Sequence, residues 1–135
     1  MLSCYITSLQ NCIFEGEALE IQVPGSEGSF GVLSGHEKFI SAVDFGELTV
    51  TRPDKVEIKY LVWKGVFQVV MDRVVAIVDF GVKIDEIDIF KVKKYIQEDK
   101  DRIKELKESD RDDADLVEHI ESRITWYEKL LDYVK

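Results

Sequence analysis

The sequence predicts an N-terminal antiparallel β-sandwich over residues 1–84, followed by an antiparallel two-helix hairpin over residues 85–135. Up to about residue 83, apolar and polar residues alternate as they do in strands. Beyond that point the apolar residues step by three and four, the seven-residue repeat of paired helices. The polar run at residues 109–113 divides this repeat into two matched halves. A chain of 135 residues allows one ordinary domain, or one small domain with an appendage.

Alternating segments define the predicted strands. Leu19, Ile21 and Val23 alternate with polar residues, which indicates a strand with one solvated face. The pattern recurs at residues 48–50 and 56–63, is interrupted at Gly65, and resumes over residues 66–71. Residues 74–80 are apolar on both faces and are expected to form the most buried strand. Turns are expected at residues 24–25, 28, 45–46, 53–54 and 72–73. Short strands at this spacing are typical of a sandwich or flattened barrel.

Two apolar stripes define the predicted helical hairpin. The first comprises Ile89, Val92, Ile96, Asp99, Ile103 and Leu106, and the second comprises Val117, Ile120, Ile124, Tyr127, Leu131 and Val134. The helices are expected to begin near Asp85 and near Asp112 or Asp113, because acidic side chains are favourable at the positive end of a helix.

Asp99 is the one charged residue of the first stripe. A carboxylate in an apolar seam is unfavourable unless it is paired. It either weakens the hairpin locally or faces a basic side chain such as Lys100 or Lys129.

Charge and hydropathy exclude several classes of function. The formal net charge is −9, shared between both halves of the chain, and this argues against nucleic acid and against direct docking on anionic lipid. The sequence has no apolar run of about 18 residues, which a transmembrane helix needs. The N-terminus resembles neither a secretory signal nor a transit peptide. We therefore expect the protein to work in the compartment where it is made.

The sequence offers no catalytic constellation and no metal site. Cys4 and Cys12 are expected to be small buried side chains in a reducing compartment. With His36 and His119 they are too few and too scattered to suggest a metal centre. His36 and Glu37 are neighbours on an extended chain and point to opposite faces, so they make a poor catalytic dyad. His36 is more typical of a structural residue or a partner contact.

The glycine-rich run PGSEGSFGVLSGH occupies residues 24–36. A phosphate-binding loop would need a lysine and a following helix, and the run has neither. Glycine is instead expected here for tight turns and for close approach of neighbouring chains.

This run, in its context, resembles the signature of the epsilon subunit of rotary F-type ATP synthases. The matching segments also include FEGEA at residues 14–18, GELTV at residues 46–50 and WKGVFQV at residues 63–69, so the resemblance covers nearly the whole chain. It implies a ten-stranded β-sandwich followed by two helices. It further implies a non-catalytic central-stalk subunit that couples rotation of the proton-driven c ring to ATP synthesis in the catalytic head.

The resemblance also implies partners and a location. These are the gamma subunit, the c ring and, when the hairpin extends, the catalytic alpha/beta head, at the cytoplasmic face of a bacterial inner membrane. The chain is expected to be a monomer in isolation and to need no cofactor. Residues 27–36 form the segment that the family turns toward the ring and stalk, so Glu27, Ser29 and His36 are the expected contact residues.

Two properties of some relatives are expected to be weak or absent. Some bind ATP through the phrase Ile-Asp-x-x-Arg-Ala and arginines of the second helix. Here Asp88 matches, but Lys91 replaces the arginine and lacks its planar fork, which leaves Arg123 as the remaining candidate. Some relatives also inhibit ATP hydrolysis through basic residues of the second helix, where acidic residues predominate in this chain. We therefore expect electrostatic inhibition to be weak.

The alternative reading is a free-standing β-sandwich that binds a ligand or peptide and dimerises through its hairpin. A stalk subunit should bind gamma and be monomeric alone. A free-standing dimer should instead show a concentration-dependent mass without a partner.

Overall fold

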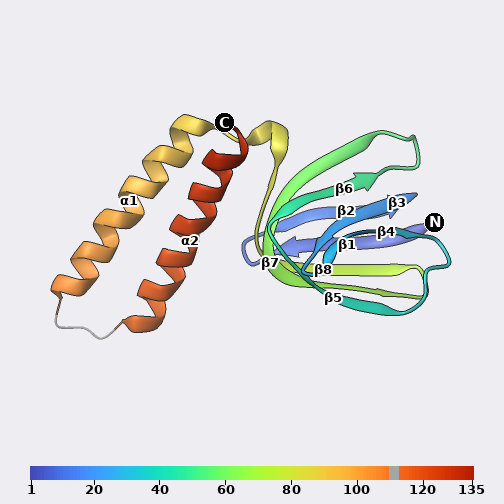
Figure 1. The fold of residues 1–135 in the computed structure, drawn as a ribbon, viewed down its shortest axis with the longest axis horizontal. Helices are drawn as coiled ribbons and strands as arrows, with labels where there is room; N and C mark the ends of the chain where they lie inside the picture. Colours follow the sequence, from blue (N-terminus) through green and yellow to red (C-terminus); the bar gives the residue numbers. More distant parts are fainter. Residues whose placement is uncertain (110–112) are drawn as a thin grey trace. The chain divides into compact units, whose positions relative to one another are not determined.

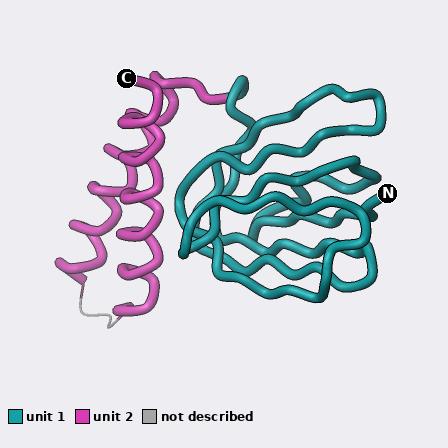
Figure 2. The backbone as a smooth tube through the Cα atoms, turned by 45° about the vertical axis from the view of Figure 1, so that its right-hand side comes forward, with its two compact units in different colours: residues 1–86 teal, residues 87–135 magenta. Residues whose placement is uncertain are grey.

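The computed structural model describes residues 1–109 and 113–135, which form two compact units. The first spans residues 1–86 and the second residues 87–135 (Figure 2). The boundary therefore follows Glu86, two residues beyond the boundary that the sequence suggested. The first unit is built from strands and the second from two helices (Figure 1).

The described part of the chain contains eight strands, which confirms the sandwich class. In chain order they are β1 (Leu2–Ser8), β2 (Cys12–Ala18), β3 (Glu20–Gly25), β4 (Gly28–Leu33), β5 (Phe39–Val43), β6 (Gly46–Thr51), β7 (Glu57–Val70) and β8 (Arg73–Lys83). All neighbouring strands pair antiparallel except β1 and β8, which pair parallel.

The two long strands β7 and β8 belong to both layers. Residues 57–62 of β7 pair with β6, whereas residues 65–69 pair with β5. We call β2-β1-β8-β7-β5 sheet A and β4-β3-β6-β7-β8 sheet B. The expected count of ten strands is therefore too high. A count of ten results when β7 and β8 are each counted twice, once in each sheet.

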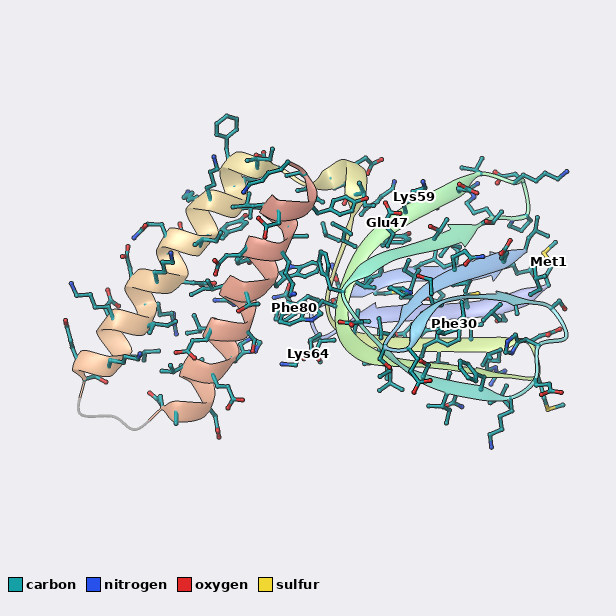
Figure 3. The ribbon with its side chains drawn as sticks, in the orientation of Figure 1. Met1, Phe30, Glu47, Lys59, Lys64 and Phe80 are labelled. Atoms are coloured by element: carbon teal, nitrogen blue, oxygen red, sulfur yellow. The ribbon has the colours of Figure 1, made fainter. Side chains whose placement is uncertain are left out.

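The predicted interruption at Gly65 is wrong, because β7 runs through this position without a break. The strand curves at Lys64, which Figure 3 labels. The backbone of Lys64 adopts the left-handed region, with φ at 72°. An added Cβ on Gly65 would collide with the carbonyl oxygen of Ile77 and lie 2.6 Å from the Cα of Val78. Glycine is thus needed for close approach of β8, not for a chain break.

The core lies between the two sheets. Its largest fully buried side chains include Phe67, Leu2, Ile6, Ile21 and Leu48. Phe30, labelled in Figure 3, packs edge-to-face on Phe67 with ring centroids 5.5 Å apart.

The prediction that β8 is buried on both faces is wrong. Val74, Ala76 and Val78 are buried, but Ile77 between them is 51% exposed. One face of β8 points into the core and the other lies on the outside of sheet A, which nothing in the sandwich covers.

Two predicted turns shift by one or two residues. The β7–β8 turn is formed by Met71 and Asp72, both at positive φ (48° and 62°), the conformation of a tight two-residue hairpin. Pro24 lies within β3, and the turn follows at residues 26–27.

The second unit consists of α1 (Ile89–Glu108) and α2 (Ala114–Tyr133), preceded in the first unit by the 3₁₀ turn η1 (Ile84–Glu86). The prediction of a helix start near Asp85 is wrong, because the N-cap is Asp88, whose carboxylate accepts from the backbone N–H groups of Phe90 and Lys91. Asp113 is the N-cap of α2, which confirms one of the two predicted starts of this helix. Asp112, with the rest of residues 110–112, lies outside the described residues.

The two helices pair antiparallel along the predicted seam. Val92, Ile120 and Ile124 are buried there, and the rings of Tyr95 and Tyr127 lie 5.7 Å apart. Trp126 and Leu130 are also buried, although neither belongs to the predicted stripe. The buried face of α2 is therefore wider than the seven-residue repeat indicates.

Candidate functional site

An ion pair between a buried aspartate and a half-buried arginine joins the two helices of the hairpin. Asp99, only 7% exposed, accepts two hydrogen bonds from Arg123: Nε to Oδ2 at 2.8 Å and Nη2 to Oδ1 at 2.7 Å. This is the bidentate geometry of a strong charge-assisted pair. These hydrogen bonds raise the pKa of Arg123 above its ordinary value, so the guanidinium stays charged. The sequence suggested a basic partner for Asp99 such as Lys100 or Lys129. The partner is instead Arg123, on the other helix of the hairpin.

The structure does not bring the three candidate nucleotide residues together. Asp88 caps the start of α1, and Lys91 lies exposed in its first turn. Arg123 is held at Asp99, about 12 Å along the helix axis from Lys91 at 1.5 Å per residue. The fork that would meet a phosphate is already occupied by a carboxylate.

The three candidate contact residues lie in β4 or next to its ends. Glu27 lies in the turn before β4, Ser29 is exposed near its start, and His36 follows its end. A strand of six residues spans about 20 Å. Glu27 and His36 therefore lie at opposite ends of β4, and one small partner patch does not reach both.

His36 is anchored at its end of the strand. Its Nδ1 lies 2.7 Å from the carbonyl oxygen of Glu37, and its ring lies 5.9 Å from that of Phe39. Phe39 packs in turn edge-to-face on Phe30, at 5.1 Å. His36 is thus a half-buried residue beside the aromatic pair of Phe39 and Phe30.

Asp72 ties three segments together at the same end of the sandwich. Its carboxylate accepts from the hydroxyl of Ser34 and from the backbone N–H of Gly35, both at 2.7 Å. Its own carbonyl oxygen accepts from the backbone N–H of Ser3. The β7–β8 turn, the end of β4 and the start of β1 are therefore joined through one residue.

Replacing Asp72 by asparagine is expected to make the stability less dependent on pH in the acid range. Its hydrogen bonds from Gly35 and Ser34 lower the pKa of Asp72 below the ordinary 3.8. Because the pKa of Asp72 is lower in the folded state, its ionised carboxylate stabilises the fold above pH 3.8. This stabilisation is lost as the pH falls through the folded-state pKa. Asparagine tolerates the left-handed backbone but carries no charge. Melting temperatures of both proteins between neutral and acid pH should converge as the pH falls, and parallel curves would contradict the assignment.

Four exposed apolar side chains lie on the outside of sheet A. Tyr5, Ile40, Val66 and Ile77 are 43%, 59%, 52% and 51% exposed, and we call this set the outer apolar face. Val66 pairs directly with Ile77 across β7 and β8, and both lie on the side opposite to the buried Phe67. Exposed apolar side chains grouped on one face of a sheet are candidates for a binding surface. The sequence reasoning missed this surface, although residues apolar on the solvated side of a strand were a signal for it.

The two cysteines differ, which corrects the expectation that both are buried. Cys4 is buried in β1, and burial raises the pKa of its thiol to about 11. Cys12 is exposed, because it begins the edge strand β2 opposite the register shift of β1.

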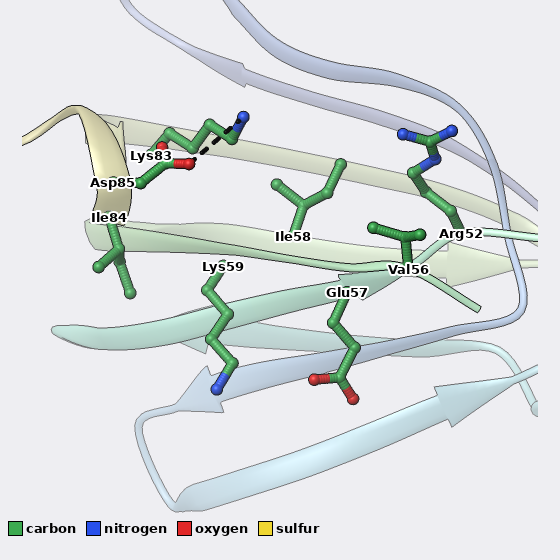
Figure 4. Close-up of a pocket in the computed structure, with 8 residues that line it drawn as sticks. All are labelled: Arg52, Val56, Glu57, Ile58, Lys59, Lys83, Ile84 and Asp85. Atoms are coloured by element: carbon green, nitrogen blue, oxygen red, sulfur yellow. Dashed lines mark ion pairs between the residues drawn. The ribbon is translucent and has the colours of Figure 1, made fainter. Parts of the chain in front are cut away.

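A cavity of about 490 Å³ opens between the start of β7 and the end of β8 (Figure 4). Arg52, Lys59 and Lys83 line it beside the apolar Val56 and Ile58. Its cations are partly neutralised, since Arg52 pairs with Asp54 at 2.8 Å and Lys83 with Asp85 at 3.8 Å.

Two further features bear on the function. Within residues 1–109 and 113–135, no three His, Cys, Asp or Glu side chains gather in a way that could hold a metal ion. None of the helices in that part of the chain is long and apolar enough to cross a bilayer.

Comparison with known proteins places the chain in a family. Residues 1–83 match the model of the β-sandwich domain of the ATP synthase delta/epsilon chain. An ATP synthase epsilon chain of Sulfurimonas denitrificans is 30% identical over 121 residues, which cover 90% of this chain and 93% of that one. One from Geobacter sulfurreducens is 33% identical over 100 residues, 74% of this chain and 72% of its own.

The fold is also found in a solved complex. A chain in the cryo-EM structure of the Euglena gracilis mitochondrial ATP synthase, OSCP/F1/c-ring in rotational state 1, aligns over 99% of this chain and 81% of its own, with a TM-score of 0.65 and 23% identity. The chain belongs to the ATP synthase epsilon chain family, as a non-catalytic subunit of the complex rather than an enzyme or a free-standing binding module.

Proposed function

We propose that this subunit binds the gamma subunit of the rotor through the outer apolar face, so that rotation of the c ring is transmitted to the catalytic head. The observation that carries this proposal is the paired exposure of Val66 and Ile77 on a rigid sheet. Burying apolar area of this kind against a partner stabilises the complex in proportion to the area. A close-packed sandwich transmits force because its interior resists deformation.

The remaining contacts are assigned to the two ends of β4. We propose that the two ends contact different parts of the c ring and the gamma subunit, because about 20 Å separates them. Glu27 and Ser29 lie at one end, and His36 lies at the other. In this proposal the subunit lies at the cytoplasmic face of a bacterial inner membrane, as a peripheral part of the complex. An extended hairpin would reach the alpha/beta head.

Replacing Val66 by glutamate is expected to weaken binding to gamma by tenfold or more, because a carboxylate would have to be desolvated in an apolar interface. Val56 offers a matched control, since it is 49% exposed, nearly as much as Val66 at 52%, but lies outside the outer apolar face. Val56→Glu should change the affinity by less than about twofold. The dissociation constants are measured with gamma from the same ATP synthase. Equal effects of the two substitutions would contradict the proposed face.

A further inference from the structure

We propose that the free edge of β4 takes up an extended segment of the rotor partner, which adds to sheet B as an extra strand. The inference rests on the proposed function for the identity of the partner, and it concerns a different surface from the outer apolar face.

The topology leaves one side of β4 unpaired. In the described chain β4 ends the strand order and pairs with β3 alone. The two-residue turn closes on the pair Gly25 and Gly28, and successive pairs then alternate between bonded and non-bonded. The backbone groups of Ser29, Gly31 and Leu33 therefore point outward. One of these outward groups is already bonded, because the carbonyl oxygen of Leu33 accepts from the N–H of His36 at 3.1 Å. The other outward groups of β4 are available to an added strand.

The edge of β4 lacks the features that normally prevent pairing with another chain. Natural edge strands are protected by charges, prolines or bulges. At the other end of the strand order, β2 carries Glu15 and Glu17, and its pairing with β1 shifts register between Ile6 and Thr7. The six residues of β4, GSFGVL, contain no charge and no proline. The molecule thus protects one terminal strand and leaves the other open.

Charge identifies the occupant as a segment with basic flanks. Glu27 lies just before β4, Glu20 pairs with its last residue, and Glu37 with Lys38 follows its end. The surroundings are therefore acidic on balance. A second copy of this chain carries the same charges and a net −9, which disfavours self-pairing. Leu33, 58% exposed, would contact an apolar side chain of the added strand.

Amide hydrogen exchange in the unmodified chain tests the proposal. The N–H groups of Ser29, Gly31 and Leu33 should exchange quickly in the isolated protein and slow by at least about tenfold when gamma from the same synthase is bound. Absence of any binding to gamma would overturn the proposed function together with this inference. Binding that leaves these amides unprotected would overturn the strand addition alone. Protection that depends on the concentration of the isolated chain would show self-pairing and overturn the proposed occupant.

A pair of variants isolates the backbone contribution. Gly31→Pro removes one outward N–H and leaves the bonds to β3 intact, whereas Gly31→Ala changes only the side chain. The affinity for gamma should fall about tenfold in Gly31→Pro and by less than twofold in Gly31→Ala. Melting temperatures establish that both variants are folded, and equal affinities would overturn the proposal.

Discussion

Replacing Arg123 by methionine is expected to destabilise the helical hairpin by about 3 kcal/mol, because the carboxylate of Asp99 is then buried without a partner. Asp99 is 7% exposed and has both oxygens bonded to Arg123. The helical far-UV signal of the full chain should be lost at lower temperature or lower urea than in the unsubstituted protein.

Two further variants separate the pair itself from the cost of breaking it. Arg123→Lys keeps the charge but loses the planar fork, so an intermediate loss is expected. The double variant Asp99→Leu with Arg123→Met removes both charges and should regain most or all of the stability, since an apolar pair avoids desolvation. A single variant Arg123→Met as stable as the unsubstituted chain would show that Asp99 is solvated, contrary to its burial.

Replacing Gly65 by alanine is expected to destabilise the β-sandwich by about 3 kcal/mol. The added Cβ would meet the backbone of Ile77 and Val78, not a flexible side chain. Because β8 runs through both sheets, moving its backbone would disturb the whole core. Urea unfolding of the full chain, followed by near-UV circular dichroism, measures the effect.

Gly31→Ala is the matched control, because its Cβ would meet chiefly the far end of the Gln22 side chain, 2.6 Å from Nε2. That side chain can rotate away, so a change within about 0.5 kcal/mol is expected. If both glycine substitutions cost the same, the close approach of β8 is not what fixes glycine at position 65.

The sequence predicts the fold class because the signals for it lie in short stretches of neighbouring residues. Side-chain alternation and the seven-residue repeat report which face of an element is buried, and each is read within a few residues. Hence the sandwich, the hairpin and the seam residues Val92, Ile120 and Ile124 follow from the pattern. The resemblance of residues 24–36 to a family signature supplied the function.

Several features escaped that reading because they depend on strands distant in the sequence. Gly65 looked like a chain break, but its role is set by β8, which approaches it from residues 77–78. The resemblance implied ten strands, whereas the described chain has eight, because β7 and β8 each join two sheets. The partner of Asp99 is 24 residues away on another helix, so its neighbours in the sequence could not reveal it.

The candidate contact residues illustrate the same limit. Glu27, Ser29 and His36 are close in the sequence, but β4 holds the first and last of them about 20 Å apart. The outer apolar face is assembled from β1, β5, β7 and β8, and no single segment displays it.

The amino-acid sequence by itself determined the two-part architecture and the family, because burial periodicity and a long ordered motif are properties of neighbouring residues. Only the tertiary structure decided which surface is left apolar, which sheet edge is left open and which charges meet, because pairing across sheets and helices joins residues that the chain keeps far apart.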